Sequence, residues 1–243
     1  MYNFTKRVID IIVSLTVLVL FIPIFILIIP VLRFSGDGDI FYLQERIGYK
    51  NRKFYIWKFA TMVKNSLHIG LGGVTIKNDP RVTTIGRILR KTKINEIPQV
   101  INILKGDMTL IGPRPLIQAG FENYSKEMQQ KIYNVKPGLT GIGSIIFRDE
   151  ETLVSNSTDF NLLYKNINSY KGKLELWYQK NQTFRTDLLI IFLTAYSIVA
   201  PNQTLTYKVF KDLPVLDSNA EINLMVKKVE KRRSYHNKME LGV

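Results

Sequence analysis

The sequence predicts a mainly α-helical membrane protein that carries one short β-hairpin. An apolar run over residues 8–32 is long enough for a membrane helix, because about 20 apolar residues cross a bilayer. Residues 40–60 alternate apolar and polar side chains, which predicts a hairpin with Phe41–Ile47 paired to Phe54–Phe59. Helical spacing of apolar residues then recurs in the basic segment 81–93 and in the segment that follows it.

The apolar N-terminal segment fits two arrangements in a membrane. It is too long for a signal peptide, and its length suits a spanning helix. However, Pro23 removes a backbone hydrogen bond in mid-segment and bends a helix, and basic residues flank both ends, with Lys6 and Arg7 before and Arg33 after. Positively charged flanks prefer the cytoplasmic side. A re-entrant helix that enters the bilayer, bends and returns therefore explains these residues as well as a spanning helix does.

The composition limits which classes of partner and which kinds of metal ion the chain can bind. The chain has 243 residues and a formal net charge of +14, which predicts an anionic partner such as nucleic acid, acidic lipid or a phosphorylated substrate. The apolar N-terminal run favours a membrane surface over nucleic acid. The chain has no cysteine and two histidines, so any metal would be a hard cation held by oxygen ligands.

Five further segments carry weaker expectations, and two of them have alternatives that the residues leave open. The helix expected over 81–93 suits the lipid headgroup layer or the surface of a core, and the apolar stretch 187–200 is interfacial or buried. We expect a mobile loop at 65–79 and irregular, site-forming backbone over 107–148. The basic residues after Pro214 predict a tail that contacts anionic lipid.

The densest polar cluster, Arg87–Gln99, places cations before a carboxylate. Pro98 disfavours helix at the preceding residue, so Asn95 and Glu96 fall where a helix starts. Arginines and helix N-termini favour phosphate; alternatively, Asn95 caps the helix and Glu96 complements its dipole. Two prolines bracket Arg114, which suits either bidentate phosphate recognition or a solvated turn.

Two other segments are weaker candidates. Lys136–Gly143 contains three glycines, which allow backbone to approach a ligand closely. Asp149, Glu150 and Glu151 form an acidic triplet in a basic chain. Such a triplet is either a solvated turn or a cluster of oxygens for Mg²⁺.

In this order, these segments resemble the small monotopic phosphoglycosyl transferases of the bacterial sugar transferase family. The resemblance runs from about Lys6 to Pro201. The motifs that carry it are Lys6-Arg7-x-x-Asp10, Gln44-x-Arg46-x-Gly48, Phe54-x-x-x-Lys58-Phe59, Asp79-Pro80-Arg81-x-Thr83-x-x-Gly86-Arg87-x-Leu89-Arg90, Asn95-Glu96-x-Pro98-Gln99, Gly106-Asp107-Met108, Gly112-Pro113-Arg114-Pro115, Pro137-Gly138-x-Thr140-Gly141 and Tyr178-x-x-Asn181-x-Thr183-x-x-x-Asp187.

The resemblance implies an enzyme at the cytoplasmic face of the bacterial inner membrane. It implies a re-entrant membrane helix over 1–35, a phosphoglycosyl transferase domain over 36–201 and a basic tail over 202–243, without the extra spanning domain of larger relatives. The reaction would transfer a sugar-1-phosphate from a UDP-sugar to undecaprenyl phosphate with Mg²⁺, releasing UMP, as the first membrane step of glycan assembly. Further expected partners are anionic lipid and a second copy of the chain, but no nucleic acid.

The resemblance also assigns residues. Lys58, Arg90, Glu96, Arg114 and Asp187 align with family residues that matter for activity or phosphate binding. Arg81 and Pro113 join Arg90 and Arg114 as expected substrate-binding residues, and Glu96, Asp149 and Glu150 are the expected metal ligands.

One departure from the family pattern concerns the nucleophile. The family has an aspartate that attacks the β-phosphate, and this chain has Asn95 in its place. Either Glu96 becomes the nucleophile, or Asp149 or Glu150 supplies the missing carboxylate. Alternatively, the lipid phosphate attacks the UDP-sugar directly, or the chain is an impaired paralogue that acts as a scaffold. We favour an active enzyme in which Asp149 and Glu150 compensate for Asn95, counting Asn95 and Asp149 among the catalytic candidates.

Overall fold

The computed structural model describes residues 2–66, 75, 78–150, 160–199 and 204–214. Most of the loop expected at 65–79, Glu151 of the acidic triplet and the basic tail lie outside the described residues. The described elements are α1 (Tyr2–Arg33), β1 (Phe41–Ile47), η1 (Tyr49–Asn51), β2 (Lys53–Phe59), α2 (Thr84–Lys91), η3 (Ile94–Gln99), α3 (Val100–Lys105), β3 (Thr109–Ile111), α4 (Gln118–Glu122), α5 (Lys126–Lys131), β4 (Gly138–Thr140), α6 (Ile142–Ile146), α8 (Phe160–Lys180), α9 (Phe184–Val199) and α10 (Thr204–Val209).

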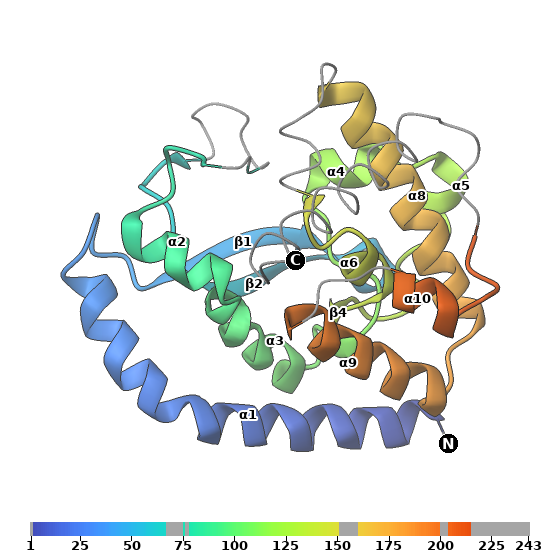
Figure 1. The fold of residues 1–243 in the computed structure, drawn as a ribbon, viewed down its shortest axis with the longest axis horizontal. Coiled ribbons are helices and arrows are strands. Elements are labelled where there is room, and N and C mark those ends of the chain that lie inside the picture. Colours follow the sequence, from blue (N-terminus) through green and yellow to red (C-terminus); the bar gives the residue numbers. More distant parts are fainter. Residues whose placement is uncertain (1, 67–74, 76–77, 151–159, 200–203, 215–243) are drawn as a thin grey trace, which may run out of the picture.

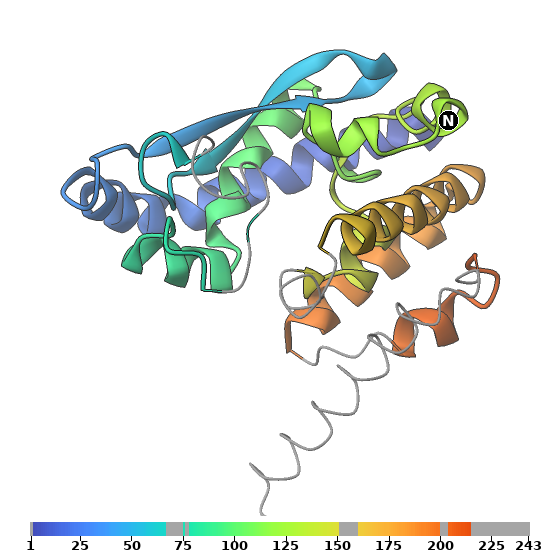
Figure 2. The ribbon, with the colours of Figure 1, turned by 90° about the horizontal axis from the view of Figure 1, so that it is seen from above.

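The expected fold class is confirmed: the described chain is mainly helical and contains a short antiparallel hairpin. α1 lies along one side of the molecule beneath the hairpin and α3, while α8, α9 and α10 form a second helical group (Figure 1). Figure 2, seen from above, separates the two groups, with α1 running along the hairpin side. The main apolar core lies in the second group, where α6, α8 and α9 pack together.

The hairpin forms with the expected strands and register. Phe41 pairs with Phe59 and Ile47 with Lys53, so β2 begins one residue earlier than the sequence pattern predicts. The side chain of Asn102 in α3 accepts a hydrogen bond from the Trp57 amide at 3.0 Å and is fully buried. This contact fixes α3 against β2.

The segment 107–148 is more regular than the sequence suggests. It contains short helices and two three-residue strands, β3 and β4, which pair in parallel. Their pairing is close because Gly112 and Gly138 face each other: a Cβ on Gly138 would lie 2.1 Å from the Gly112 nitrogen. The 21-residue helix α8 was also not expected from the sequence.

The helix α1 has an inverted burial pattern. It continues through Pro23 and Pro30, and it turns upward toward its far end (Figure 1). Its buried residues include the polar Asp10 and Ser14. The exposed large apolar residues of α1 are Phe4, Val8, Ile12, Leu15, Val19, Leu20, Ile22, Ile26, Leu27 and Val31. A monomer rarely exposes so large an apolar surface unless lipid or a partner covers it.

The start of α1 is attached to the body by buried polar contacts, which we call the N-terminal clamp. Lys6 Nζ lies 2.5 Å from Asp187 Oδ2, and the Tyr178 hydroxyl donates to Asp187 Oδ1 at 2.6 Å. Asp10, which is 4% exposed, accepts hydrogen bonds from the Thr109 hydroxyl at 2.7 Å and from the Leu110 backbone amide at 3.0 Å. The clamp therefore ties α1 to α8, α9 and β3.

The far end of α1 is attached by apolar contacts. Leu32 is buried with Phe59 of β2 and Leu89 of α2, and Phe25 meets Phe59 edge to face at 5.4 Å between ring centroids. Both ends of the helix thus contact the same body. Among the described residues, α1 is also the single helix long and apolar enough to cross a membrane.

Asp187→Asn should destabilise the protein by loosening the N-terminal clamp. Removing one charge of a buried, hydrogen-bonded pair leaves Lys6 uncompensated, a loss of about 3 kcal/mol. Thermal unfolding in detergent measures it. Glu127→Gln makes the same type of change at an exposed pair with Lys131 and should leave the midpoint nearly unchanged. Equal midpoints for the two variants would contradict a structural role for Asp187.

Candidate functional site

Four elements bring charged side chains to one place beside the hairpin. β1 carries Arg46 and β2 carries Lys58, while η3 carries Glu96 and packs against β2. Arg114 follows β3 in the turn bracketed by two prolines. The chain turns into η3 at Lys93, which has a left-handed backbone with φ of 61°.

Glu96 lies at the centre of these cations, and we call Arg46, Lys58 and Arg114 the cation cluster. Arg114 Nη2 donates to Glu96 Oε1 at 2.8 Å, and Nη1 lies 3.5 Å from Oε2, so the guanidinium faces both carboxylate oxygens. Lys58 Nζ is 3.9 Å from Glu96 Oε1. Arg46 donates to the Pro115 carbonyl at 3.1 Å, which places its charge on the same turn.

The cations repel one another and are poorly solvated. Burial, together with the charges of Arg46, Arg114 and Arg90, lowers the pKa of Lys58 to about 7, although the attraction of Glu96 opposes this shift. Burial and the Arg114 charge also lower the pKa of Arg46 to about 10. Such a site favours an added anion, because a phosphate would relieve the repulsion and accept hydrogen bonds.

Glu96 stays ionised despite its burial. Desolvation alone would raise its pKa, but the charges of Arg114 and Lys58 outweigh it and hold the pKa far below its ordinary value. The carboxylate is therefore charged at neutral pH.

Asn95 does not cap a helix, so this part of the alternative is wrong, whereas Glu96 does lie in the first turn of η3. It lies inside η3, whose N-cap position is Lys93, and its residue is 7% exposed. Its Oδ1 is buried without a hydrogen-bond partner among the described residues. An amide oxygen beside Glu96 thus remains available to a ligand.

The expected substrate-binding residues separate into two groups. Arg90 is near enough to Lys58 to lower its pKa, and the Pro113 carbonyl accepts the Gly138 amide at 2.9 Å, which supports the turn at Arg114. Arg81 is instead 5% exposed and forms an ion pair with Asp79 at 2.6 Å. Its contacts indicate that Arg81 holds the backbone before α2.

The acidic candidates are also divided. Glu150 forms an ion pair with Lys171 of α8 at 2.5 Å, although its charge also raises the pKa of Arg114. Asp149 lies in the turn that follows α6, directly before Glu150. In the part of the chain that is described, no three histidine, aspartate or glutamate side chains gather in a group able to hold a metal.

Sequence reasoning missed Glu175. This residue of α8 is 3% exposed and accepts the Gly143 amide at 3.2 Å. A Cβ on Gly143 would lie 2.7 Å from Glu175 Oε1, and one on Gly141 would lie 3.2 Å from Oε2. The glycines of this segment therefore make room for a carboxyl group of the chain itself. Burial raises the pKa of Glu175 to about 8.

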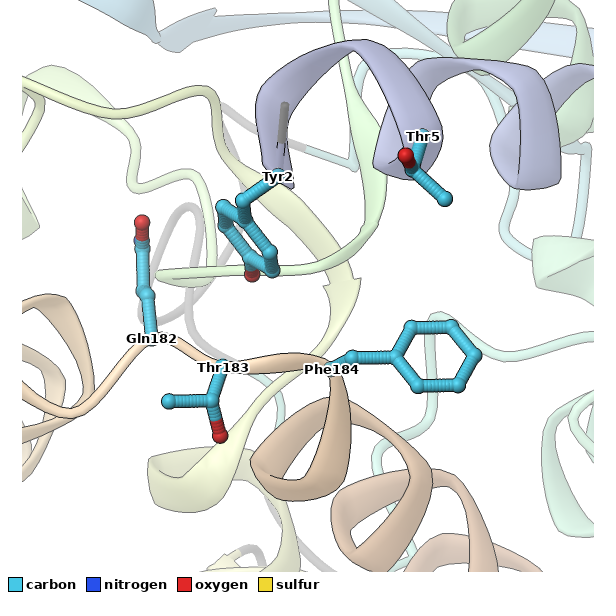
Figure 3. Close-up of a pocket in the computed structure, with 5 residues that line it drawn as sticks. All are labelled: Tyr2, Thr5, Gln182, Thr183 and Phe184. Carbon is cyan, nitrogen blue, oxygen red and sulfur yellow. The ribbon is translucent and has the colours of Figure 1, made fainter.

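A cavity of about 360 Å³ lies apart from the cation cluster, between the start of α1 and the α8–α9 connection. Tyr2 and Thr5 face Gln182, Thr183 and Phe184 across it (Figure 3). It borders the N-terminal clamp, because the Tyr2 hydroxyl donates to Asp187 at 2.9 Å. None of its five lining residues carries a positive charge, in contrast to the cation cluster.

Comparison with known proteins decides the family. A family model described as bacterial sugar transferase matches residues 1–201. The chain belongs to the bacterial sugar transferase family. This agrees with the resemblance in the sequence motifs, which runs from about Lys6 to Pro201.

Individual relatives in the family are similar over most of this chain. A UDP-N-acetylgalactosamine-undecaprenyl-phosphate N-acetylgalactosaminephosphotransferase of Aeromonas hydrophila is 32% identical over 82% of this chain and 44% of its own length. The undecaprenyl-phosphate galactose phosphotransferase of Salmonella typhimurium is 32% identical over 79% and 40%. The exopolysaccharide production protein ExoY of Sinorhizobium fredii is 30% identical over 78% and 83%. The chain thus spans less than half the length of the first two.

Glu96→Gln should weaken the fold at low salt and make it more responsive to phosphate. The amide removes the carboxylate that offsets the cation cluster, at a cost of about 3 kcal/mol, and inorganic phosphate can take its place. Thermal unfolding with and without inorganic phosphate measures both effects. Glu127→Gln serves as the matched control. A phosphate response equal to that of the unmodified chain would contradict anion binding at the cation cluster.

Proposed function

We propose that this protein transfers a sugar-1-phosphate from a UDP-sugar to undecaprenyl phosphate and releases UMP. The observation that carries the proposal is the cation cluster around Glu96, placed in the same body that α1 contacts at both ends. The relatives named above as undecaprenyl-phosphate sugar phosphotransferases support the same reaction for this family member.

The geometry suits phosphoryl transfer, which needs positioning and charge neutralisation more than elaborate chemistry. Arg114 presents two donors in one plane and Lys58 adds a compact charge, so together they can hold a diphosphate. The charged Glu96 contacts both cations, so its carboxylate lies next to the expected position of the diphosphate. The carboxylate can attack the β-phosphorus, which breaks the bond to the bridging oxygen and releases UMP, and the lipid phosphate then takes the sugar phosphate from the carboxylate. Alternatively, Glu96 orients the lipid phosphate for direct attack on the same phosphorus with the same leaving group.

We propose Mg²⁺ as the cofactor. Mg²⁺ typically binds one or two carboxylates and completes its coordination with substrate phosphates and water. Glu96 and the buried Asn95 Oδ1 fit this donor set, whereas Glu150 is occupied by Lys171. When bound, the ion would neutralise charge on the diphosphate.

The same proposal places the protein at the cytoplasmic face of the inner membrane with α1 re-entrant. A 32-residue helix is about 48 Å long, more than the roughly 30 Å hydrocarbon core. Contact with one body at both ends supports a re-entrant helix over a straight crossing. In α9, Phe184, Leu188 and Phe192 are exposed and suit the lipid surface. Anionic lipid and a second copy of the chain remain predictions.

Asn95 favours a second candidate function, a scaffold without turnover. An amide is a poor nucleophile, so loss of the family's aspartate could end catalysis while donor binding survives. UMP release from UDP-sugars with undecaprenyl phosphate in detergent separates the two functions. UDP binding without UMP release from any UDP-sugar would favour the scaffold.

Replacing Lys58 with Met or Glu96 with Gln should lower UMP release by at least about 100-fold. Each change removes a charge that the transferred phosphoryl group needs, and loss of a single electrostatic contact in an active site has effects of this size. Glu127→Gln should retain full activity. Retention of activity in both site variants would place the reaction elsewhere.

Asn95→Asp tests the departure from the family and should raise the rate of UMP release.

Single cysteines should show that both ends of α1 lie on one side of the membrane. The chain has no native cysteine, so Asn3→Cys, Asp39→Cys and Lys126→Cys each give one exposed thiol. A membrane-impermeant maleimide added outside inverted membrane vesicles, whose outer surface is the cytoplasmic face, should label all three thiols. Labelling of the first position only from the opposite side would rule out a re-entrant helix.

A further inference from the structure

Glu175 lies beneath the turn that carries Arg114, although the proposed reaction gives it no role. The Gly112 amide donates to the Thr140 carbonyl at 3.0 Å, and the Gly138 amide donates to the Pro113 carbonyl at 2.9 Å. These bonds join the turn before Arg114 to the strand that leads to Gly141. Because Glu175 packs against Gly141 and Gly143, it supports both backbone segments from below.

Within the described part of the chain, Glu175 forms no ion pair of its own. Lys171, one turn earlier on α8, is paired with Glu150 at 2.5 Å. The Arg114 side chain is directed to Glu96; its charge and its backbone amide both lower the pKa of Glu175, but burial outweighs them. Glu175 Oε2 is buried without a hydrogen bond of regular geometry among the described residues.

The other charged or titratable groups around Glu175 do not compensate for its burial. Tyr124, Tyr133 and Arg114 lie close enough to Glu175 for its negative charge to raise the pKa of each of them. The Gly143 amide and Lys171 lower the pKa of Glu175, but burial outweighs them and raises it to about 8. The carboxyl group is therefore mostly neutral at neutral pH.

We propose that Glu175 is a positioning residue whose neutral form supports Arg114 in binding the donor diphosphate, and whose ionisation weakens that binding. This inference rests on the proposed function, because it takes a nucleoside diphosphate as the ligand. An ionised Glu175 would place a negative charge beside the turn of Arg114, in a poorly solvated region where charges act strongly. It would both repel the diphosphate and compete for the Arg114 charge.

The sign of the pH effect follows from the protonation state. Below its pKa, Glu175 is neutral and the cation cluster attracts the diphosphate fully. As the pH rises through this value, the carboxylate forms and affinity falls. Lys58 also loses its charge in this range. The effect of Glu175 is therefore the difference in the pH dependence of affinity between the unmodified chain and a variant in which Glu175 is replaced and Lys58 is kept.

Glu175→Gln isolates the charge. The amide oxygen can still accept the Gly143 hydrogen bond and fills nearly the same volume, but it cannot ionise. Calorimetric titration of UDP into the full chain in detergent gives the dissociation constant. Between about pH 7 and about pH 9, we expect it to rise at least about fivefold more in the unmodified chain than in Glu175→Gln. Glu127→Gln should follow the unmodified chain.

A second measurement reads the carboxyl group itself. The infrared band of a buried protonated carboxylic acid should be present near neutral pH, disappear on alkalinisation and be absent in Glu175→Gln. A purely structural role predicts the same pH profile of UDP affinity in both proteins, and that result would overturn the inference, as would absence of the band. If either of these results is obtained while the unmodified chain still releases UMP, the inference about Glu175 fails and the proposed function stands. If the unmodified chain releases UMP from no UDP-sugar, the proposed function fails instead.

Discussion

The attachment of α1 through its few polar side chains is the constraint on which the rest of the structure depends. Buried polar groups need partners, and in an apolar helix the partners must come from elsewhere. Asp10 finds them on β3 and Lys6 finds Asp187 on α9. These contacts fix which side of α1 faces the body, and they leave its apolar side chains exposed. The buried polar groups thus determine which face this candidate membrane anchor presents.

The same attachment reaches the phosphate site through β3. Asp10 bonds to Thr109 at the start of this strand, and Arg114 follows five positions after Thr109. The strand is held from the other side by β4, whose backbone leads to the glycines above Glu175. One short piece of backbone, β3, therefore contacts the membrane-anchor candidate α1 at one end and leads into the turn of Arg114 at the other.

Local patterns sufficed for the hairpin, for α1 and for the helices around 81–93 and 187–200, because each has a regular alternation or an apolar run. They missed α8, whose inward face mixes Tyr170, Leu174 and Tyr178 with the buried Glu175. Motif resemblance identified Glu96, Lys58 and Arg114, which the structure brings together. It could not show that Asp187 pairs with Lys6, or that Glu175 is desolvated, because both depend on contacts between segments distant in sequence.

The substitution at Asn95 changes the charge of the site as well as its chemistry. Three cations surround Glu96, and an aspartate at this position would have supplied a second negative charge. With an amide there, the cation cluster is less neutralised, so its attraction for a diphosphate is stronger than the family pattern would give. The neutral state of Glu175 acts in the same direction. Under the proposed function, both features strengthen the attraction of the site for the diphosphate. Glu96 is left as the charged carboxylate in contact with the cation cluster, so any covalent step at this site depends on it.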